Sequence, residues 1–233
     1  MSDTLLESDT AVAQAAERLR SAAASGVACA PVRDLIGAAD IARAYAVQQQ
    51  VNGARVAAGA RVVGRKIGLT SSAVQQQLGV DRPDLGVLFT DMEHDAARPV
   101  PVDRYLQPKV EAEIAFVLGT DLVDGELDLD QVRDAVHHAV AAIEICDSRV
   151  AGWDITFGDT VADNASAGGF VLGTVRRALA DFSPVDAVMS MTVTGQEDST
   201  GTGADCLGDP LLALQWLART ARDLGDPLRA GQV

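Results

Sequence analysis

Histidine and cysteine are scarce in this chain of 233 residues. It contains three histidines and three cysteines, and the cysteines (Cys29, Cys146 and Cys206) are odd in number and show neither CxxC nor metal-ligand spacing. The sequence therefore gives no zinc motif and no disulfide framework, and no basic, apolar secretory segment opens it. We expect the protein to reside in the cytoplasm.

Basic residues are also few. Lys and Arg total 19 against 33 Asp and Glu, the net charge is −14, and no Lys/Arg cluster occurs. A phosphate backbone or an anionic membrane would repel such a chain. No apolar run approaches the roughly 20 residues that cross a bilayer. We expect neither nucleic acid nor a membrane as a partner, and a chain of this length suits one folded unit with at most a small appendage.

Two glutamates alternate with apolar residues in the run Gln107–Gly119, which has the pattern of a strand. Glu111 and Glu113 then share one face, about 6.5–7 Å apart, so both side chains can reach one cation. A third carboxylate, Glu144, lies in the apolar run 141–146. With histidine scarce, oxygen ligands favour Mg²⁺ or Mn²⁺ over zinc. Spacing alone leaves open a solvated strand face that carries two acids.

The remaining pattern mixes helices and strands without a regular βαβ rhythm. Apolar periodicity and capping residues predict helices over 9–24, 40–52, 71–78, 128–140 and 210–223. Strands are predicted over 61–68, 107–119, 141–146, 169–175 and 187–194. Residues 79–98 and 153–167 are rich in Asp, Gly and small residues and are expected to be loops. This arrangement predicts an α+β fold.

Two polar residues stand among apolar neighbours. Lys66 interrupts the strand 62–68, where a buried ammonium must be paired, and is a candidate acid, base or substrate anchor. The alternative is a lysine on the outer face of an edge strand. Asp84 lies between two apolar segments and could orient or deprotonate a water molecule, although an ordinary turn aspartate is equally consistent with the pattern.

Three other sequence features bear on function: a polar segment, a histidine pair and the glycine motifs of nucleotide-binding proteins. The segment 157–168 combines small and polar residues, as expected of a loop whose backbone approaches a ligand, and a plain surface loop is the alternative. His137 and His138 fall on the predicted helix, which favours a non-catalytic role. Dinucleotide and phosphate-binding glycine motifs are absent from the sequence, which disfavours NAD and ATP chemistry.

Four separated motifs carry a family resemblance: Gly64–Ser71, Val74–Gly86, Gln107–Glu113 and Asp159–Ser166. Together they resemble the 2-keto-4-pentenoate hydratases, which belong with the 2-oxo-3-hexenedioate decarboxylases to the fumarylacetoacetate hydrolase superfamily. The resemblance implies an α+β fold with a mixed β-roll or barrel core and flanking helices. It further implies an N-terminal helical segment over 1–60, a catalytic domain over 61–233, and a homo-oligomer.

The resemblance also implies a site and a reaction. The implied metal ligands for Mg²⁺ or Mn²⁺ are Glu111, Glu113 and Glu144, the proton-handling pair is Lys66 and Asp84, and the substrate contacts are Ser166 and Leu78. The implied reaction adds water to 2-hydroxypenta-2,4-dienoate in aromatic catabolism and gives 4-hydroxy-2-oxopentanoate. A 2-oxo acid would chelate the cation, which would stabilise an enolate.

Two alternatives remain beside the hydratase. Decarboxylation of a longer oxo-diacid uses the same enolate stabilisation, but the run 74–86, with its acid at Asp84, resembles the hydratase pattern more closely. An inactive scaffold or binding protein is the other alternative, because the chain ends at Val233 where the family continues through closing strands. We expect either a longer natural product or a site that lacks this wall.

Overall fold

The computed structural model describes residues 2–233, except the side chains of residues 2–8, 73, 77 and 78. Its helices are α1 (Ser2–Ser25), α2 (Arg33–Ile36), α3 (Ile41–Ala57), α4 (Ser72–Leu78), α5 (Leu129–Ala135), α6 (Phe157–Ala162) and α7 (Pro210–Asp223). Its strands are β1 (Val62–Gly68), β2 (Asp84–Phe89), β3 (Glu93–His94), β4 (Lys109–Leu118), β5 (Val136–Cys146), β6 (Ala167–Leu172), β7 (Val188–Met191) and β8 (Ser199–Thr202).

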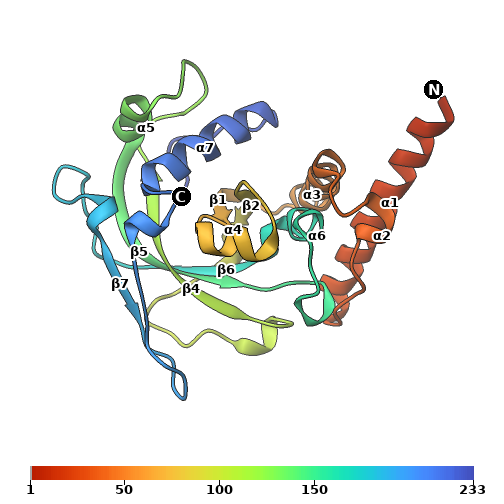
Figure 1. Cartoon of the computed structure of the whole chain (residues 1–233), viewed down its shortest axis with the longest axis horizontal. Helices are drawn as coiled ribbons and strands as arrows, with labels where there is room; N and C mark the ends of the chain where they lie inside the picture. Colours follow the sequence, from red (N-terminus) through yellow and green to blue (C-terminus); the bar gives the residue numbers. More distant parts are fainter. Residues whose placement is uncertain (1) are drawn as a thin grey trace.

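The strands form three separate sheets within the described residues. A four-stranded sheet has the order β3-β6-β5-β4, while β1 pairs with β2 and β7 pairs with β8. Strands β4 and β5 are antiparallel and paired along nearly their whole length. Figure 1 shows α1, α2 and α3 grouped at one side of the molecule, with α5 and α7 at the other. The α+β prediction is confirmed; the predicted roll or barrel is not, since the described sheets do not close.

One hydrophobic core joins the two ends of the chain. Buried side chains of α1 and α3, such as Leu19 and Val47, belong to the same cluster as Leu214 and Leu217 of α7. Helix α7 begins as the sequence predicts, because the Asp209 carboxylate accepts the backbone N–H of the second helical residue at 2.8 Å. The proposed boundary between residues 60 and 61 stays a prediction. No helix among residues 2–233 combines the length and apolarity that a bilayer crossing demands.

The helix predicted over 128–140 is wrong in its second half. Helix α5 ends at Ala135, and the chain continues directly as strand β5. Leu129, Val132, Val136 and Val140 fit a helical stripe, but pairing with β4 decides the conformation from Val136 onward. The two adjacent histidines of this segment therefore lie on a strand.

The two predicted loops contain regular structure. Residues 84–89 of the first form strand β2, in which every residue is buried against neighbouring elements. After Asp84 this short run is apolar throughout and shows no alternation, so its sequence pattern is ambiguous. The second, 153–167, contains α6, whose first turn has a reciprocal capping box between Thr156 and Asp159.

Asp159 anchors α6 to the N-terminal segment. Its fully buried carboxylate accepts the backbone N–H groups of Val32 at 2.8 Å and Arg33 at 2.9 Å, and the Arg33 guanidinium at 2.9 Å. It also accepts the Thr156 backbone N–H at 2.9 Å and hydroxyl at 2.8 Å. Burial alone would raise the pKa of Asp159, but these donors outweigh it and hold the pKa below its ordinary value.

The depressed pKa of Asp159 gives a pH-dependent contribution to stability. The contribution is complete above the pKa of the unfolded chain, about 4, and is lost as the pH falls through the lower folded value. We expect Asp159→Asn to have a lower urea midpoint than the wild type at pH 7. Between pH 5 and pH 3 the urea midpoint of the variant should fall less steeply than that of the wild type. Parallel declines in the two proteins, measured by urea unfolding across that range, would contradict this assignment.

Candidate active site

Strand pairing brings two carboxylates together. Glu111 of β4 lies directly opposite Glu144 of β5, so the two side chains share one face of the sheet. Cys146 lies two residues further along β5, on the same face. One oxygen of each glutamate and the Cys146 Sγ all lie within 4.8 Å of one another. We call Glu111, Glu144 and Cys146 the acidic cluster.

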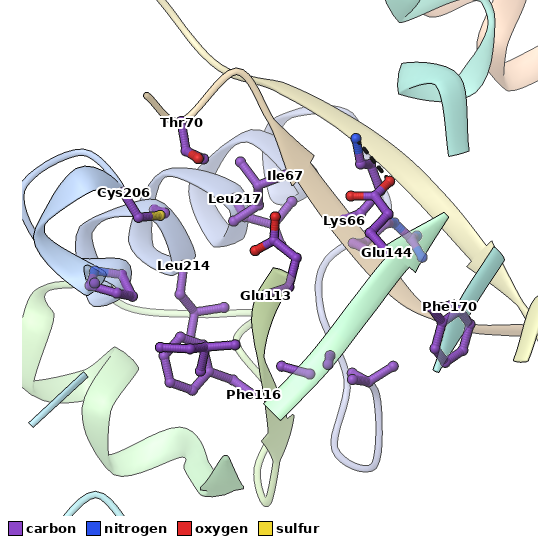
Figure 2. Close-up of a pocket in the computed structure, with 18 of the residues that line it drawn as sticks. Lys66, Ile67, Thr70, Glu113, Phe116, Glu144, Phe170, Cys206, Leu214 and Leu217 are labelled. Atoms are coloured by element: carbon purple, nitrogen blue, oxygen red, sulfur yellow. Dashed lines mark ion pairs between the residues drawn. The ribbon is translucent and has the colours of Figure 1, made fainter. Parts of the chain in front are cut away.

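Lys66 supplies positive charge to the acidic cluster. Its Nζ lies 3.1 Å from Glu144 Oε1 (Figure 2). The same Nζ donates to the carbonyl of Ala165 at 3.0 Å. The Lys66 side chain is only 9% exposed, so it is not an outward-facing lysine of an edge strand. Burial lowers the pKa of Lys66, but the charges of Glu144 and Asp84 outweigh burial and raise it. Lys66 is therefore a buried ammonium ion at neutral pH.

Asp84 lies beside Lys66 in the interior. Its Oδ2 accepts a hydrogen bond from the Thr160 hydroxyl at 3.3 Å, and Thr160 is in turn 3.3 Å from the Ser166 hydroxyl. A Cβ on Gly68 would meet both Asp84 Oδ1 and Lys66 Nζ, so these two groups border the same small space. Burial raises the pKa of Asp84, and the Lys66 charge only partly opposes it. Asp84 thus has the environment of a proton-transfer group.

A left-handed turn leads from Asp163 into strand β6. Asn164, Ala165 and Ser166 have φ values of 57°, 51° and 52°, a conformation that costs roughly 1–2 kcal/mol for each non-glycine residue. The Asn164 side chain holds the turn against β2, since it accepts the Val87 N–H at 2.8 Å and donates to the Val87 carbonyl at 2.9 Å. Asn52 of α3 donates to the same amide oxygen at 2.9 Å. These bonds fix the Ala165 carbonyl and the Ser166 hydroxyl.

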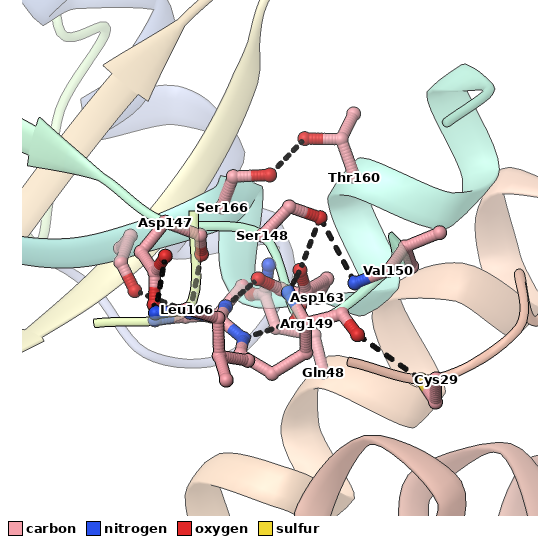
Figure 3. A network of polar contacts seen from close by, with 12 residues as sticks. Cys29, Gln48, Leu106, Asp147, Ser148, Arg149, Val150, Thr160, Asp163 and Ser166 are labelled. Atoms are coloured by element: carbon pink, nitrogen blue, oxygen red, sulfur yellow. Dashed lines mark hydrogen bonds and ion pairs between the residues drawn. The ribbon is translucent and has the colours of Figure 1, made fainter. Parts of the chain in front are cut away.

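An ion pair between Arg149 and Asp163 holds the start of the same turn (Figure 3). The buried carboxylate of Asp163 accepts the Arg149 Nε at 2.5 Å, the Arg149 N–H at 2.8 Å and the Ser148 hydroxyl at 3.1 Å. Arg149 Nη1 also donates to the carbonyls of Asp147 at 2.6 Å and Ala167 at 2.9 Å. The end of β5 and the start of β6 are thereby held together next to the acidic cluster.

A cavity of about 150 Å³ opens beside the acidic cluster. Lys66, Glu113 and Glu144 line it together with apolar side chains (Figure 2). The apolar lining consists chiefly of Ile67, Leu88, Phe116, Phe170, Leu172, Leu214 and Leu217. Arg65 also borders the cavity, but its guanidinium forms an ion pair with Asp226. The cavity is therefore charged around the cluster and apolar over most of its remaining wall.

Glu113 lines this cavity as a half-buried carboxyl group. Burial, followed by the charges of Glu144 and Glu111, raises its pKa to about 8. Its oxygens do not belong to the set of ligand atoms that Glu111, Glu144 and Cys146 form. The structure thus brings two of the three predicted metal ligands together and places the third nearby. Ligation by all three glutamates stays a prediction.

The donor set fits a divalent cation. Glu144 is 7% exposed, its pKa is raised chiefly by burial, and its Oε1 makes no hydrogen bond of ordinary geometry although Lys66 is close. Lys66 supplies one positive charge against the two facing carboxylates, Glu111 and Glu144, so a further cation would lower the cost of holding them together.

Ser166 and Leu78 are the two predicted substrate contacts. Ser166 is buried and contacts Thr160, so a direct substrate contact stays a prediction. The side chain of Leu78 lies outside the described residues. Sequence reasoning missed Cys146 as a potential ligand and Asn52 as a support for the turn. Asn164 falls in the segment 157–168 that was predicted to approach a ligand, but only its residue type pointed to the turn, since asparagine tolerates the left-handed conformation.

Comparison with known proteins identifies the family. The family described as Fumarylacetoacetate (FAA) hydrolase C-terminal matches residues 61–233. The chain belongs to this family, which confirms the resemblance drawn from the four motifs.

Individual relatives narrow the class to hydratases. The chain is 52% identical to "TodF product hydratase" of Pseudomonas putida over 96% of this chain and 83% of that protein. It is 50% identical to a "2-keto-4-pentenoate hydratase" of Burkholderia vietnamiensis over 98% of this chain and 87% of that protein.

Among solved structures, 4-oxalocrotonate decarboxylase from Pseudomonas putida G7, complexed with magnesium and adipate, superposes with a TM-score of 0.86. The two sequences are 28% identical, and the match covers 96% of this chain and 85% of that one. Fumarylpyruvate hydrolase from Pseudomonas aeruginosa, in complex with Mn²⁺ and pyruvate, superposes with a TM-score of 0.52 at 16% identity. This match covers 74% of this chain and 75% of that one, and it shows the fold alone.

The left-handed turn predicts unequal effects of two substitutions at Asn164. Both Asn164→Gly and Asn164→Ala remove the amide that pairs with the buried backbone of Val87, at a cost of about 1–3 kcal/mol. Alanine also retains the strain of positive φ, so we expect it to be less stable than glycine by about 1 kcal/mol. Equilibrium urea unfolding measures both. A glycine variant as stable as the wild type would show that the amide bonds contribute nothing.

Proposed function

We propose that this protein is a divalent-cation-dependent hydro-lyase that adds water to 2-hydroxypenta-2,4-dienoate and produces 4-hydroxy-2-oxopentanoate. Identity of about 50% with curated hydratases over nearly the whole chain supports this function. The structural observation that carries it is the pairing of Glu111 with Glu144 beside a buried lysine, with Glu144 and Lys66 lining a largely apolar cavity.

Glu111 and Glu144 would hold the cation, with Glu113 as a third carboxylate. Oxygen donors of this kind suit Mg²⁺ or Mn²⁺. When bound, such an ion supplies Lewis-acid stabilisation of the negative charge that develops on a 2-oxo acid. The magnesium complex of the decarboxylase relative is consistent with this assignment. Self-association and a cytoplasmic location stay predictions of the sequence.

The remaining polar groups would handle the substrate and its protons. Lys66 stays charged because its pKa is raised, which suits it to bind the substrate carboxylate. The pKa of Asp84 is also raised, which suits a carboxyl group that exchanges protons with water. Tautomerisation would move the proton of the 2-hydroxyl group to C5, and water would then add its hydroxyl to C4 and a proton to C3. Asp84 would take the proton that the attacking water loses.

The cavity wall favours hydration over decarboxylation of an oxo-diacid. The distal carboxylate of a diacid needs a cationic partner inside the cavity. Within the described lining, the two cations are Lys66, paired with Glu144, and Arg65, paired with Asp226. The apolar wall suits the uncharged end of a short dienoate instead.

A side-by-side assay tests this choice. We expect kcat/KM for hydration of 2-hydroxypenta-2,4-dienoate to exceed that for decarboxylation of 2-oxo-3-hexenedioate by about 100-fold or more, since an unpaired buried carboxylate costs several kcal/mol. Both reactions are followed by ultraviolet absorption on one enzyme preparation with saturating Mg²⁺. Faster decarboxylation would reverse the assignment.

Glu111→Gln tests the cation site without removing the partner of Lys66. We expect Mg²⁺ affinity, measured by isothermal titration calorimetry, to fall by more than about 100-fold and turnover to be lost. Stability in EDTA should be unchanged or higher, because the repulsion between Glu111 and Glu144 is relieved. Glu93→Gln, at an exposed carboxylate of β3, is the matched control. Normal Mg²⁺ affinity and turnover in Glu111→Gln would remove the cation from this site.

A further inference from the structure

Cys146 gives the acidic cluster a sulfur donor that the all-oxygen ligand set does not include. The residue is a free cysteine, 6% exposed, at the end of β5. The pairing of β5 with β6 is irregular between Ile145 and Cys146. The Cys146 Sγ nevertheless lies within 4.8 Å of oxygens from both Glu111 and Glu144. Two carboxylates and a thiol thus converge on one small volume.

A second observation marks this volume as a ligand site. Glu144 Oε1 belongs to a side chain that is 8% exposed, and it makes no hydrogen bond of ordinary geometry. Lys66 Nζ lies 3.1 Å from the same oxygen but also donates a hydrogen bond to the Ala165 carbonyl. Glu144 therefore retains acceptor capacity within the acidic cluster that it forms with Glu111 and Cys146.

Donor chemistry determines which ions would use the sulfur. Mg²⁺ binds oxygen ligands in octahedral geometry and has little affinity for sulfur, whereas Zn²⁺ and Cd²⁺ bind thiolate strongly. We propose that the acidic cluster is a mixed-donor site, in which Cys146 joins Glu111 and Glu144 as a third ligand when a thiophilic cation replaces the hard one. The proposal rests on the cation site of the proposed function. The Cys146 S–H bond breaks, its proton passes to solvent and a sulfur–metal bond forms, without any change of oxidation state.

The thiophilic ion would inhibit the enzyme for a geometric reason. Zn²⁺ is usually four-coordinate, so three protein ligands leave one open position. A 2-oxo acid that chelates through a carboxylate oxygen and the keto oxygen needs two. A six-coordinate Mg²⁺ at the same carboxylates retains enough positions for both substrate oxygens.

Cadmium titration of the metal-free protein tests the proposal. Protein stripped with EDTA is titrated with CdCl₂, and the ultraviolet charge-transfer band of a thiolate–cadmium bond is followed. We expect the band in the wild type and its loss in Cys146→Ser, with Cd²⁺ affinity at least about tenfold lower and Mg²⁺ affinity within about twofold of wild type. Calorimetry in two buffers should show one proton fewer released per Cd²⁺ in the variant.

Cys206→Ser is the matched control, since Cys206 lines the cavity that Glu144 also lines but lies outside the acidic cluster. Cys206→Ser should keep the thiolate–cadmium band, and Zn²⁺ should still inhibit its Mg²⁺-dependent turnover. Turnover of Cys146→Ser should be less sensitive to Zn²⁺. Circular dichroism shows whether each variant is folded. If the Cys146→Ser protein does not fold, Cys146→Ala takes its place.

Two outcomes would overturn the proposal. The first is a band that survives in Cys146→Ser or disappears in Cys206→Ser. The second is a wild-type protein that shows no band at saturating Cd²⁺ although it binds Mg²⁺ and hydrates the dienoate. Failure to bind Mg²⁺ together with absence of turnover would instead overturn the proposed function.

Discussion

The site depends on two carboxylates that face each other across neighbouring strands. Like charges directly opposite in a sheet destabilise it, and burial of Glu144 adds a desolvation cost. Lys66 supplies one positive charge against these two acids and also donates a hydrogen bond to the Ala165 carbonyl. These three groups leave one net negative charge, which a divalent cation would more than offset. The arrangement therefore lowers the stability of the metal-free fold in exchange for a preformed binding site.

The strained turn beside the acidic cluster also lowers the stability of the fold. Three consecutive left-handed residues are unfavourable by themselves, and they persist because side-chain hydrogen bonds tie them to neighbouring segments. Asn164 bonds to the backbone of β2, Asn52 of α3 donates to Asn164, and Arg149 pairs with Asp163 at the start of the turn. The result is a carbonyl aimed at Lys66 and a hydroxyl linked through Thr160 to Asp84. The proposed catalytic residues and the residues that support them thus form one connected polar unit.

The scaffold alone does not distinguish the reactions of this family. The decarboxylase relative superposes closely although it is only 28% identical, and cation-assisted enolate stabilisation suits both chemistries. The distinction lies in the cavity wall, where the far end of the substrate must find either a free cation or an apolar surface. In this chain both cations of the described lining are already paired.

The sequence by itself determined the residue types of the site and several local structures. Alternation identified the strand with Glu111 and Glu113, and Asp209–Pro210 identified the start of α7, because both signals are local. Strand β2 and the first half of β5 were misread, since a short apolar run or a four-residue spacing fits more than one conformation. Only the tertiary structure decided that Glu111 faces Glu144 with Cys146 beside them. That register pairs Glu111 with Glu144, which are 33 positions apart in the chain (144 − 111), and a shift of one residue would turn every side chain to the other face.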